Sequence, residues 1–176
     1  MLVVADASPL ILLGRLGLLD LLPRLFERVL TPREVFQEVA GREEGLPGSR
    51  AVREAEWLEV VDGDSEAQEA LQVTLRGELD LGEAAAIALA SSRGADLVLI
   101  DERQGRRIAR NLGLEVKGTI GILLQARRLG LVHRLEPVLE RLQEAGAWIK
   151  EDLLRAILEA AGEKPDETTT EGPPVP

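Results

Sequence analysis

The chain lacks cysteine and tyrosine, and it contains one histidine, His133, among its 176 residues. Without cysteine there can be no disulfide, no thiolate zinc site and no thiol nucleophile. A single histidine excludes a nuclease mechanism that needs two, and we interpret His133 as structural. With two Phe and two Trp, the chain has no aromatic platform on which nucleic-acid bases could stack.

Long apolar runs are also missing. No run is long enough to cross a membrane, and Asp6 and Pro9 interrupt the first apolar stretch, unlike a secretory signal. We therefore expect a cytoplasmic protein that does not bind a membrane. The length suits one domain with a full core, which we place at 1–145, followed by a helix packed on it (146–162). The polar, proline-rich residues 163–176 predict a disordered tail.

Charge is unevenly distributed along the chain. The net charge is −10, but the segment from Arg103 to Arg134 carries eight Arg and Lys residues against one acid, Glu115. A local basic surface can bind phosphates even on an acidic protein; the alternative is a set of solvated helix faces. The candidate nucleic-acid-binding residues are Arg103, Arg106, Arg107, Arg110, Lys117, Arg127 and Arg128.

Short runs of Val, Ile and Leu alternate with helical patterns along the chain. This alternation predicts an α/β fold, a three-layer α/β/α sandwich around a parallel sheet of about four or five strands, with extra C-terminal helices. The predicted strands cover residues 2–6, 28–30, 57–61, 97–100 and 114–116.

Several sequence signals predict where helices begin. Ser8 before Pro9 predicts an N-cap, and Thr31 with Glu34 has the spacing of a capping box. Asp64 predicts the start of a later helix. A separate helix is predicted over residues 17–26.

Four carboxylates are candidates for a functional site. Asp6 and Asp101 each end an apolar run that reads as a strand, Glu38 lies on the apolar flank of its helix, and Glu83 lies in the first turn of an alanine-rich helix. In α/β sheets the carboxyl ends of the strands meet at the edge where ligands bind. Carboxylates gathered there repel one another unless a cation lies between them, and oxygen ligands suit Mg²⁺ or Mn²⁺.

Each of these acids also has a structural interpretation. Asp6 could cap a turn and Asp101 could cap the helix that follows it. Glu83 could favour the helix dipole, and Glu38 could be an ordinary surface residue. We favour the cation site because four independent structural uses at one sheet edge are less probable than one shared use.

The segments around these acids resemble the motifs of the PIN-domain family of metal-dependent nucleases. The similar blocks are residues 6–11, 31–39, 81–90 and 99–103, with Glu83 where many members carry Asp. The Asp-Ala-Ser-Pro opening, the Leu-Asp-Leu-Gly-Glu segment and the Gly-Thr-Ile-Gly segment (118–121) are similar to a PIN-like subgroup whose biochemistry is largely unassigned. The resemblance covers residues 1–162.

The resemblance implies a fold and an activity. It implies an α/β/α sandwich that binds Mg²⁺ or Mn²⁺ and cleaves RNA, with Asp6, Glu38, Glu83 and Asp101 as catalytic residues and metal ligands. Ser8 would be a supporting hydroxyl. Many bacterial and archaeal members are toxins that a small antitoxin protein holds inactive. The predicted function is therefore a metal-dependent endoribonuclease, the toxin of a toxin–antitoxin pair.

One alternative is a PIN-like module that binds a protein partner without catalysis. Its surface could come from apolar side chains of the C-terminal helices, although we favour core packing for them: Leu139, Leu142, Trp148, Leu153, Ile157 and Leu158. A phosphatase of the haloacid-dehalogenase type would need a second Asp where the chain has Ser8, and no glycine-rich nucleotide motif follows Asp6. The predicted partners are an RNA substrate, a small antitoxin protein and a second copy of the chain.

Overall fold

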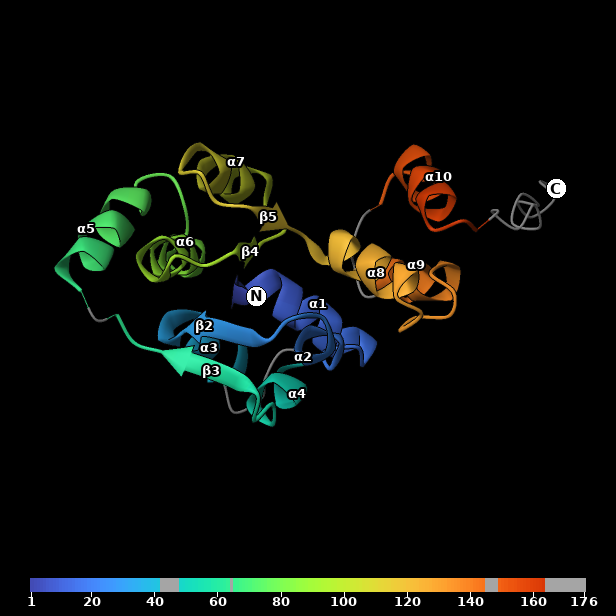
Figure 1. Ribbon diagram of the computed structural model, residues 1–176, viewed down its shortest axis with the longest axis horizontal. Coiled ribbons are helices and arrows are strands. Elements are labelled where there is room, and N and C mark those ends of the chain that lie inside the picture. The colour runs from blue at the N-terminus through green and yellow to red at the C-terminus, as the bar shows by residue number, and fades with distance from the viewer. Residues whose placement is uncertain (42–47, 64, 145–148, 164–176) are drawn as a thin grey trace, which may run out of the picture. The chain divides into compact units, whose positions relative to one another are not determined.

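The computed structural model describes residues 1–41, 48–63, 65–144 and 149–163 (Figure 1). Contacts divide the chain into two compact units, Met1–Ile122 and a second unit that begins at Leu123. The strands are β1 (Leu2–Ala5), β2 (Arg28–Pro32), β3 (Leu58–Val61), β4 (Leu97–Leu99) and β5 (Val116–Lys117). The helices are α1 (Ala7–Leu16), α2 (Leu21–Leu25), α3 (Arg33–Ala40), α4 (Ser49–Arg53), α5 (Glu66–Leu75), α6 (Leu81–Arg93), α7 (Arg103–Asn111), α8 (Thr119–Arg128), α9 (Glu136–Glu144) and α10 (Glu151–Ala160).

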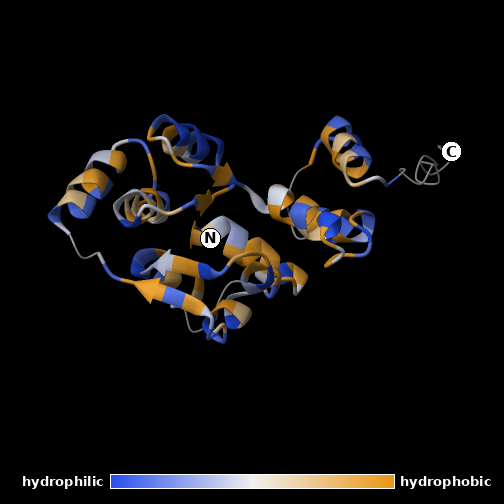
Figure 2. Ribbon diagram, in the orientation of Figure 1, coloured by the Kyte–Doolittle hydropathy of each residue, from blue (hydrophilic) through white to orange (hydrophobic). Residues whose placement is uncertain are grey.

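The five strands form one parallel sheet in the order β3-β2-β1-β4-β5. In the register, Val4 of β1 lies between Leu30 of β2 and Val98 of β4. All three side chains are buried, and Figure 2 shows the strands as largely hydrophobic. The predicted parallel sheet is confirmed, and β1 lies at its centre.

Helices cover the sheet on both faces. Because parallel crossovers are right-handed, this strand order places the β1–β2–β3 connections on one face and the β3–β4–β5 connections on the other. On the second face, α6 contacts β1, β2 and β4, and its buried alanines pack with Val4, Leu30 and Val98. The predicted three-layer sandwich is confirmed.

The predicted N-cap at Ser8 is wrong. The helix α1 begins at Ala7, and Asp6, in extended backbone, holds the N-cap position. Pro9 therefore lies at the third helical position, where the missing N–H is harmless because the first four helical N–H groups have no partner within the helix. A proline near the start of a helix does not by itself determine whether the N-cap is Ser8 or Asp6, two residues earlier.

The predicted capping box at Thr31 is also wrong. Thr31 belongs to β2, where it pairs with Val60 of β3, and its hydroxyl donates to the carbonyl of Ala5 at 3.0 Å. Pro32 takes the N-cap position of α3. The strand thus continues past the predicted helix start because Thr31 and Pro32 still pair with Val60 and Val61 of β3.

Two further helix predictions differ from the structure. The helix predicted over 17–26 is only α2, because Gly17 ends α1 in the left-handed region (φ 67°). Asp64 lies outside the described residues, and the N-cap of α5 is Ser65, whose side chain accepts from the N–H of Gln68 at 3.2 Å.

The apolar C-terminal side chains mostly pack inward. Leu139, Leu142, Ile157 and Leu158 are buried, which confirms the core-packing interpretation for these four, whereas Leu153 is 52% exposed. Trp148 lies outside the described residues. No helix in the described ranges is long and apolar enough to cross a membrane.

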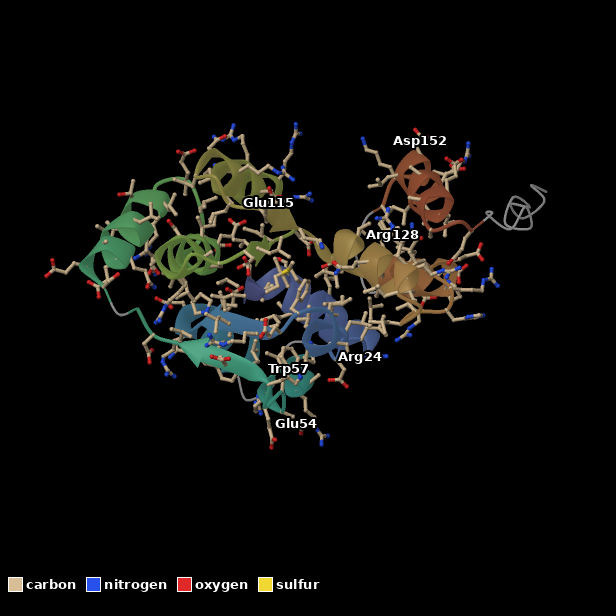
Figure 3. All side chains as sticks on the ribbon, in the orientation of Figure 1. Arg24, Glu54, Trp57, Glu115, Arg128 and Asp152 are labelled. Carbon is tan, nitrogen blue, oxygen red and sulfur yellow. The ribbon has the colours of Figure 1, made fainter. Side chains whose placement is uncertain are left out.

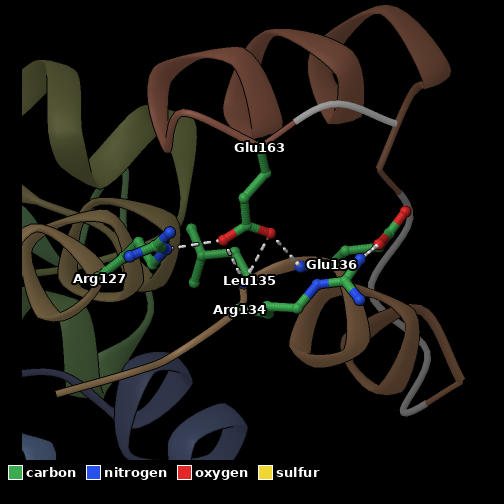
Figure 4. Close-up of polar contacts among 5 residues, drawn as sticks. All are labelled: Arg127, Arg134, Leu135, Glu136 and Glu163. Atoms are coloured by element: carbon green, nitrogen blue, oxygen red, sulfur yellow. Dashed lines mark hydrogen bonds and ion pairs between the residues drawn. The ribbon is translucent and has the colours of Figure 1, made fainter. Parts of the chain in front are cut away.

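Glu163 connects two helices of the second unit through its carboxylate (Figure 4). Its carboxylate accepts from the N–H of Leu135 (2.8 Å), just before α9, from the N–H of Glu136 (3.1 Å), the first residue of α9, and from Arg127 Nε (2.8 Å). Burial alone would raise the pKa of Glu163, but these donors lower it. The residue is therefore part of the fold and not of the predicted tail; residues 164–176 lie outside the described part.

We expect Glu163→Gln to destabilise the second unit, because the amide loses the charge that Arg127 and the α9 N-terminus stabilise. The expected loss is about 1–2 kcal/mol, measured by urea unfolding. Since the pKa of Glu163 is lower in the folded state, its contribution is present above the unfolded-state pKa and lost on acidification. The parent and variant should therefore converge in stability at low pH; a constant difference would contradict this account.

Candidate functional site

The site is built at the carboxyl edge of the sheet, beginning with Asp6. Asp6 directly follows β1, and its N–H donates to the carbonyl of Leu99 at the end of β4, at 3.0 Å. The residue is 3% exposed. A buried carboxylate between two strands is costly in free energy unless donors or a cation compensate its charge.

Glu38 and Asp6 approach each other across Gly82. A Cβ atom on Gly82, in the first turn of α6, would lie 3.0 Å from Glu38 Oε2 and 3.6 Å from Asp6 Oδ1. The sequence predicts that Glu38 lies on the apolar flank of its helix, where burying its charge would be costly. The expected burial is wrong, because Glu38 is exposed. Its carboxylate nevertheless faces the first turn of α6, and the glycine provides the space for it.

Glu83 is buried, and one of its oxygens has no partner. Asp80 Oδ1 accepts from the N–H of Glu83 at 2.8 Å, and the carboxylate of Glu83 accepts from the N–H of Asp80, a reciprocal capping box. Glu83 therefore has a structural part in this capping box, in the first turn of α6. However, Glu83 Oε1 is buried without a hydrogen bond, and such a group calls for an explanation beyond capping.

Asp6 and Glu83 share an unfavourable electrostatic environment. Burial, followed by the charges of Glu83, Asp80 and Glu38, raises the pKa of Asp6 to about 7. Burial, followed by the charges of Asp80 and Glu102, raises the pKa of Glu83 to about 7. Perturbed carboxylates of this kind concentrate at functional sites.

Asp101 makes a different set of contacts. Oδ1 accepts from the N–H of Thr119 at 2.8 Å, and Oδ2 accepts from its hydroxyl at 2.6 Å. Asp101 therefore caps α8, whereas the predicted cap on α7 is wrong, since Glu102 holds that position. Each oxygen of Asp101 thus has one donor and keeps a further lone pair that a cation could use.

Three glycines make room for the carboxylates. Besides Gly82, a Cβ on Gly105 would lie 2.6 Å from Glu83 Oε1, and a Cβ on Gly118 would lie 2.6 Å from Asp101 Oδ1. At distances this short, a side chain on Gly105 or Gly118 would force the neighbouring carboxylate to move. The glycines therefore leave the space that the carboxylates of Glu83 and Asp101 occupy.

Sequence reasoning missed Asp80, Glu102 and Thr119. The Asp80-x-x-Glu83 spacing is a capping-box signal that could have identified Asp80. The Gly-Thr segment at 118–119 was recognised as a motif, but nothing local indicates that it contacts Asp101, eighteen residues earlier. Glu102 raises the pKa of Glu83 from a distance, which no sequence pattern reveals.

The carboxylates do not form a closed metal cage. In the described ranges, no three Asp, Glu, His or Cys side chains are grouped closely enough to hold a metal ion together. The donor set still suits Mg²⁺ or Mn²⁺, because it is all oxygen and includes the orphaned Glu83 Oε1. The role of the four predicted acids as metal ligands stays a prediction, as does the supporting role of the half-buried Ser8.

The predicted basic residues fall into different environments. Lys117 lies over the ring of Phe26, 5.8 Å from its centroid, and burial lowers its pKa. Arg127 is paired with Glu163. Arg106 is half-buried near Asp101, with Nη1 3.3 Å from the position of a Gly118 Cβ. Three of the others lie on the exposed part of α7, and Arg128, labelled in Figure 3, lies on α8: Arg103, Arg107, Arg110 and Arg128.

A pocket lies near the start of β3, away from these carboxylates. It has a volume of about 430 Å³, and Trp57, which precedes β3, and Asp20, which precedes α2, are among its lining residues. None of the predicted site residues lines it. The carboxyl edge therefore remains the candidate site.

We expect Thr119→Val to lower the free energy of unfolding by about 1–2 kcal/mol, because a buried charge-assisted hydrogen bond is lost while the backbone donor remains. Thr119→Ser keeps the hydroxyl and should retain most of the stability. Urea unfolding of both variants measures the effect. Equal stability of the Ser and Val variants would show that the hydroxyl contact contributes nothing.

Comparison with protein families identifies the fold. A family model described as a PIN domain matches residues 2–163. No curated protein sequence matches the chain. The match covers most of the chain, including the sheet, the four acids and the Gly-Thr segment, and it confirms the resemblance seen in the motifs. The chain belongs to the PIN-domain family, whose fold is of nuclease type.

Proposed function

We propose that this PIN domain is a divalent-metal-dependent endoribonuclease and the toxin of a toxin–antitoxin pair. The observation that carries the proposal is the buried, unpartnered Glu83 Oε1 close to the buried carboxylate of Asp6. Two buried acids with raised pKa values make the metal-free site unfavourable, and a cation removes that repulsion. Family membership supports nuclease chemistry at this edge.

Each predicted ligand would have a distinct part. Asp6, fixed at the start of α1, and Glu83, fixed by the capping box, would hold a cation from the sheet side. Glu38 faces them across Gly82, while Asp101, oriented by Thr119, would complete the set. A bound Mg²⁺ or Mn²⁺ would supply a more acidic water and charge stabilisation for the leaving oxygen of a phosphodiester. The absence of aromatic platforms favours recognition of the backbone over that of the bases.

One observation favours the second candidate function, a non-catalytic protein-binding module. Asp101 already has donors on both oxygens, and no three-acid group is present in the described part of the chain. A site whose acids are not grouped closely enough to hold a cation would not cleave RNA.

The test is cleavage of a labelled single-stranded RNA pool of random sequence, which needs no knowledge of the target sequence. The proposal predicts shortening of the pool with Mn²⁺ or Mg²⁺ and none with EDTA. Cleavage that persists in EDTA would contradict it. An intact pool at saturating Mn²⁺ would instead support the non-catalytic module, and a search for a bound small protein would follow.

A further inference from the structure

One side of α7 carries a concentrated positive charge. Gly105, Ile108 and Ala109 are the buried residues of this helix, and Ile108 and Ala109 pack in the core beneath α6. Arg103, Arg107 and Arg110 follow one another at spacings of four and three residues and are exposed, so they share one stripe of the helix surface. We call these three residues the α7 arginine face. Figure 2 shows α7 as strongly hydrophilic.

The α7 arginine face lines a hollow. An open pocket of about 610 Å³ is lined by these three arginines with Glu102 and Gln104. The Gln104 amide donates to the carbonyl of Glu78 at 3.0 Å, and Arg107 lies 3.8 Å from the Glu78 carboxylate. Gln104 and Arg107 thus contact the segment before α6, and all three arginines are exposed.

The charge of this face is not neutralised within the described ranges. Neither Arg103 nor Arg110 forms an ion pair there, and Arg107 has only the long, exposed contact with Glu78. Like charges three and four residues apart destabilise a helix. A chain with a net charge of −10 has many acids that could have neutralised these guanidinium groups, so their clustering is best explained by an anionic ligand.

The other basic residues of the segment lack this arrangement. Lys117 contacts the Phe26 ring, and Arg127 is held by Glu163. Arg106 lies on another side of the helix, near Asp101. The structure therefore separates three of the seven predicted nucleic-acid-binding residues from the rest, which the sequence could not do.

We propose that the α7 arginine face binds the phosphate backbone of single-stranded RNA, with one guanidinium group on each of three phosphates. The helical rise of 1.5 Å per residue spreads the three arginines over about 10 Å along the axis, and planar guanidinium groups match phosphate oxygens. Contacts of this kind position a strand without reading its sequence. The choice of RNA rests on the proposed function.

The test is equilibrium binding of a fluorescent RNA of mixed sequence in EDTA, where metal-dependent cleavage cannot occur, across a range of salt concentrations. For single strands the salt slope changes by about 0.7 per phosphate contact. The variant with Arg103→Gln, Arg107→Gln and Arg110→Gln should lose about two units of slope, equal to about a 20-fold effect on affinity over a fourfold change in salt. Each single variant should lose about a third of this.

The matched control is Arg24→Gln, an exposed arginine on α2 (labelled in Figure 3) with the same change of charge. It should keep the parent slope. An equal loss in Arg24→Gln, or a parent slope in the triple variant, would overturn the inference. The inference would also be overturned if this face bound a polyglutamate peptide and did not bind RNA. RNA binding in EDTA without cleavage in Mn²⁺ would reject the proposed function and leave this inference standing.

Discussion

Asp6→Asn is expected to abolish metal-dependent RNA cleavage while making the metal-free protein more stable. The variant removes a negative charge from the centre of the proposed ligand set, and loss of such a ligand is expected to reduce activity by at least about 100-fold. The asparagine carbonyl can still accept from the N–H of Ala7, which hydrogen-bonds Asp6 in the parent. The fold should therefore persist.

The stabilisation follows from the electrostatics of the site. Asp6 is 3% exposed and close to Glu83, Asp80 and Glu38, so its ionised form destabilises the metal-free fold. Its removal should raise the melting temperature above pH 7, by about 2–4 °C for each kcal/mol regained. The matched control is Asp20→Asn, an exposed acid at the N-cap position of α2, which should change neither activity nor stability.

Two outcomes would contradict this account. Cleavage by Asp6→Asn at the parent rate would show that Asp6 is not a ligand. A metal-free variant less stable than the parent at pH 8 would show that Asp6 is a satisfied structural carboxylate.

The metal-free protein is expected to become more stable as the pH falls from 8 to 5. The pKa values of Asp6 and Glu83 are raised to about 7, above those of the unfolded chain, so the folded state binds more protons between about pH 4 and 7. Stability therefore falls as the pH rises through this window, by at most about 1.4 kcal/mol per pH unit for each group. The expected result is a downward slope of unfolding free energy from pH 5 to pH 8 in EDTA.

The control for this prediction is the difference between the parent and Asp6→Asn at each pH. Other acids, Glu59 and Asp62 among them, have lowered pKa values and act in the opposite direction, but they contribute equally to both proteins. The difference should be small at pH 5 and large at pH 8. A difference independent of pH would mean that Asp6 titrates normally.

The sheet could be predicted from the sequence because its signal is local. Short apolar runs such as Leu2–Ala5 and Leu97–Leu99 predict both that a segment is a strand and that the strand is buried. The alternation of these runs with helices predicts that the strands are parallel. The error at Thr31 has a tertiary cause. Thr31 suits a cap, but its pairing with Val60 and its hydroxyl contact with Ala5 of β1 keep it in β2.

The site was only partly predictable. Asp6 and Asp101 follow strands that are neighbours in the sheet, so their common edge follows from the topology. Both oxygens of Asp101 bind Thr119 because the start of α8 lies close to the end of β4. No local sequence pattern predicts how far apart these two ends are. The orphaned oxygen of Glu83 and the space made by Gly105 are likewise properties of packing.

The central claim is that the carboxylates at this edge bind a divalent cation, and calorimetric titration of Mn²⁺ tests it most directly. The titration uses the parent, Asp6→Asn and Asp20→Asn at pH 8, where Asp6 and Glu83 are ionised. The account predicts binding by the parent and Asp20→Asn, and its loss in Asp6→Asn. No binding by the parent, or equal binding by Asp6→Asn, would contradict it.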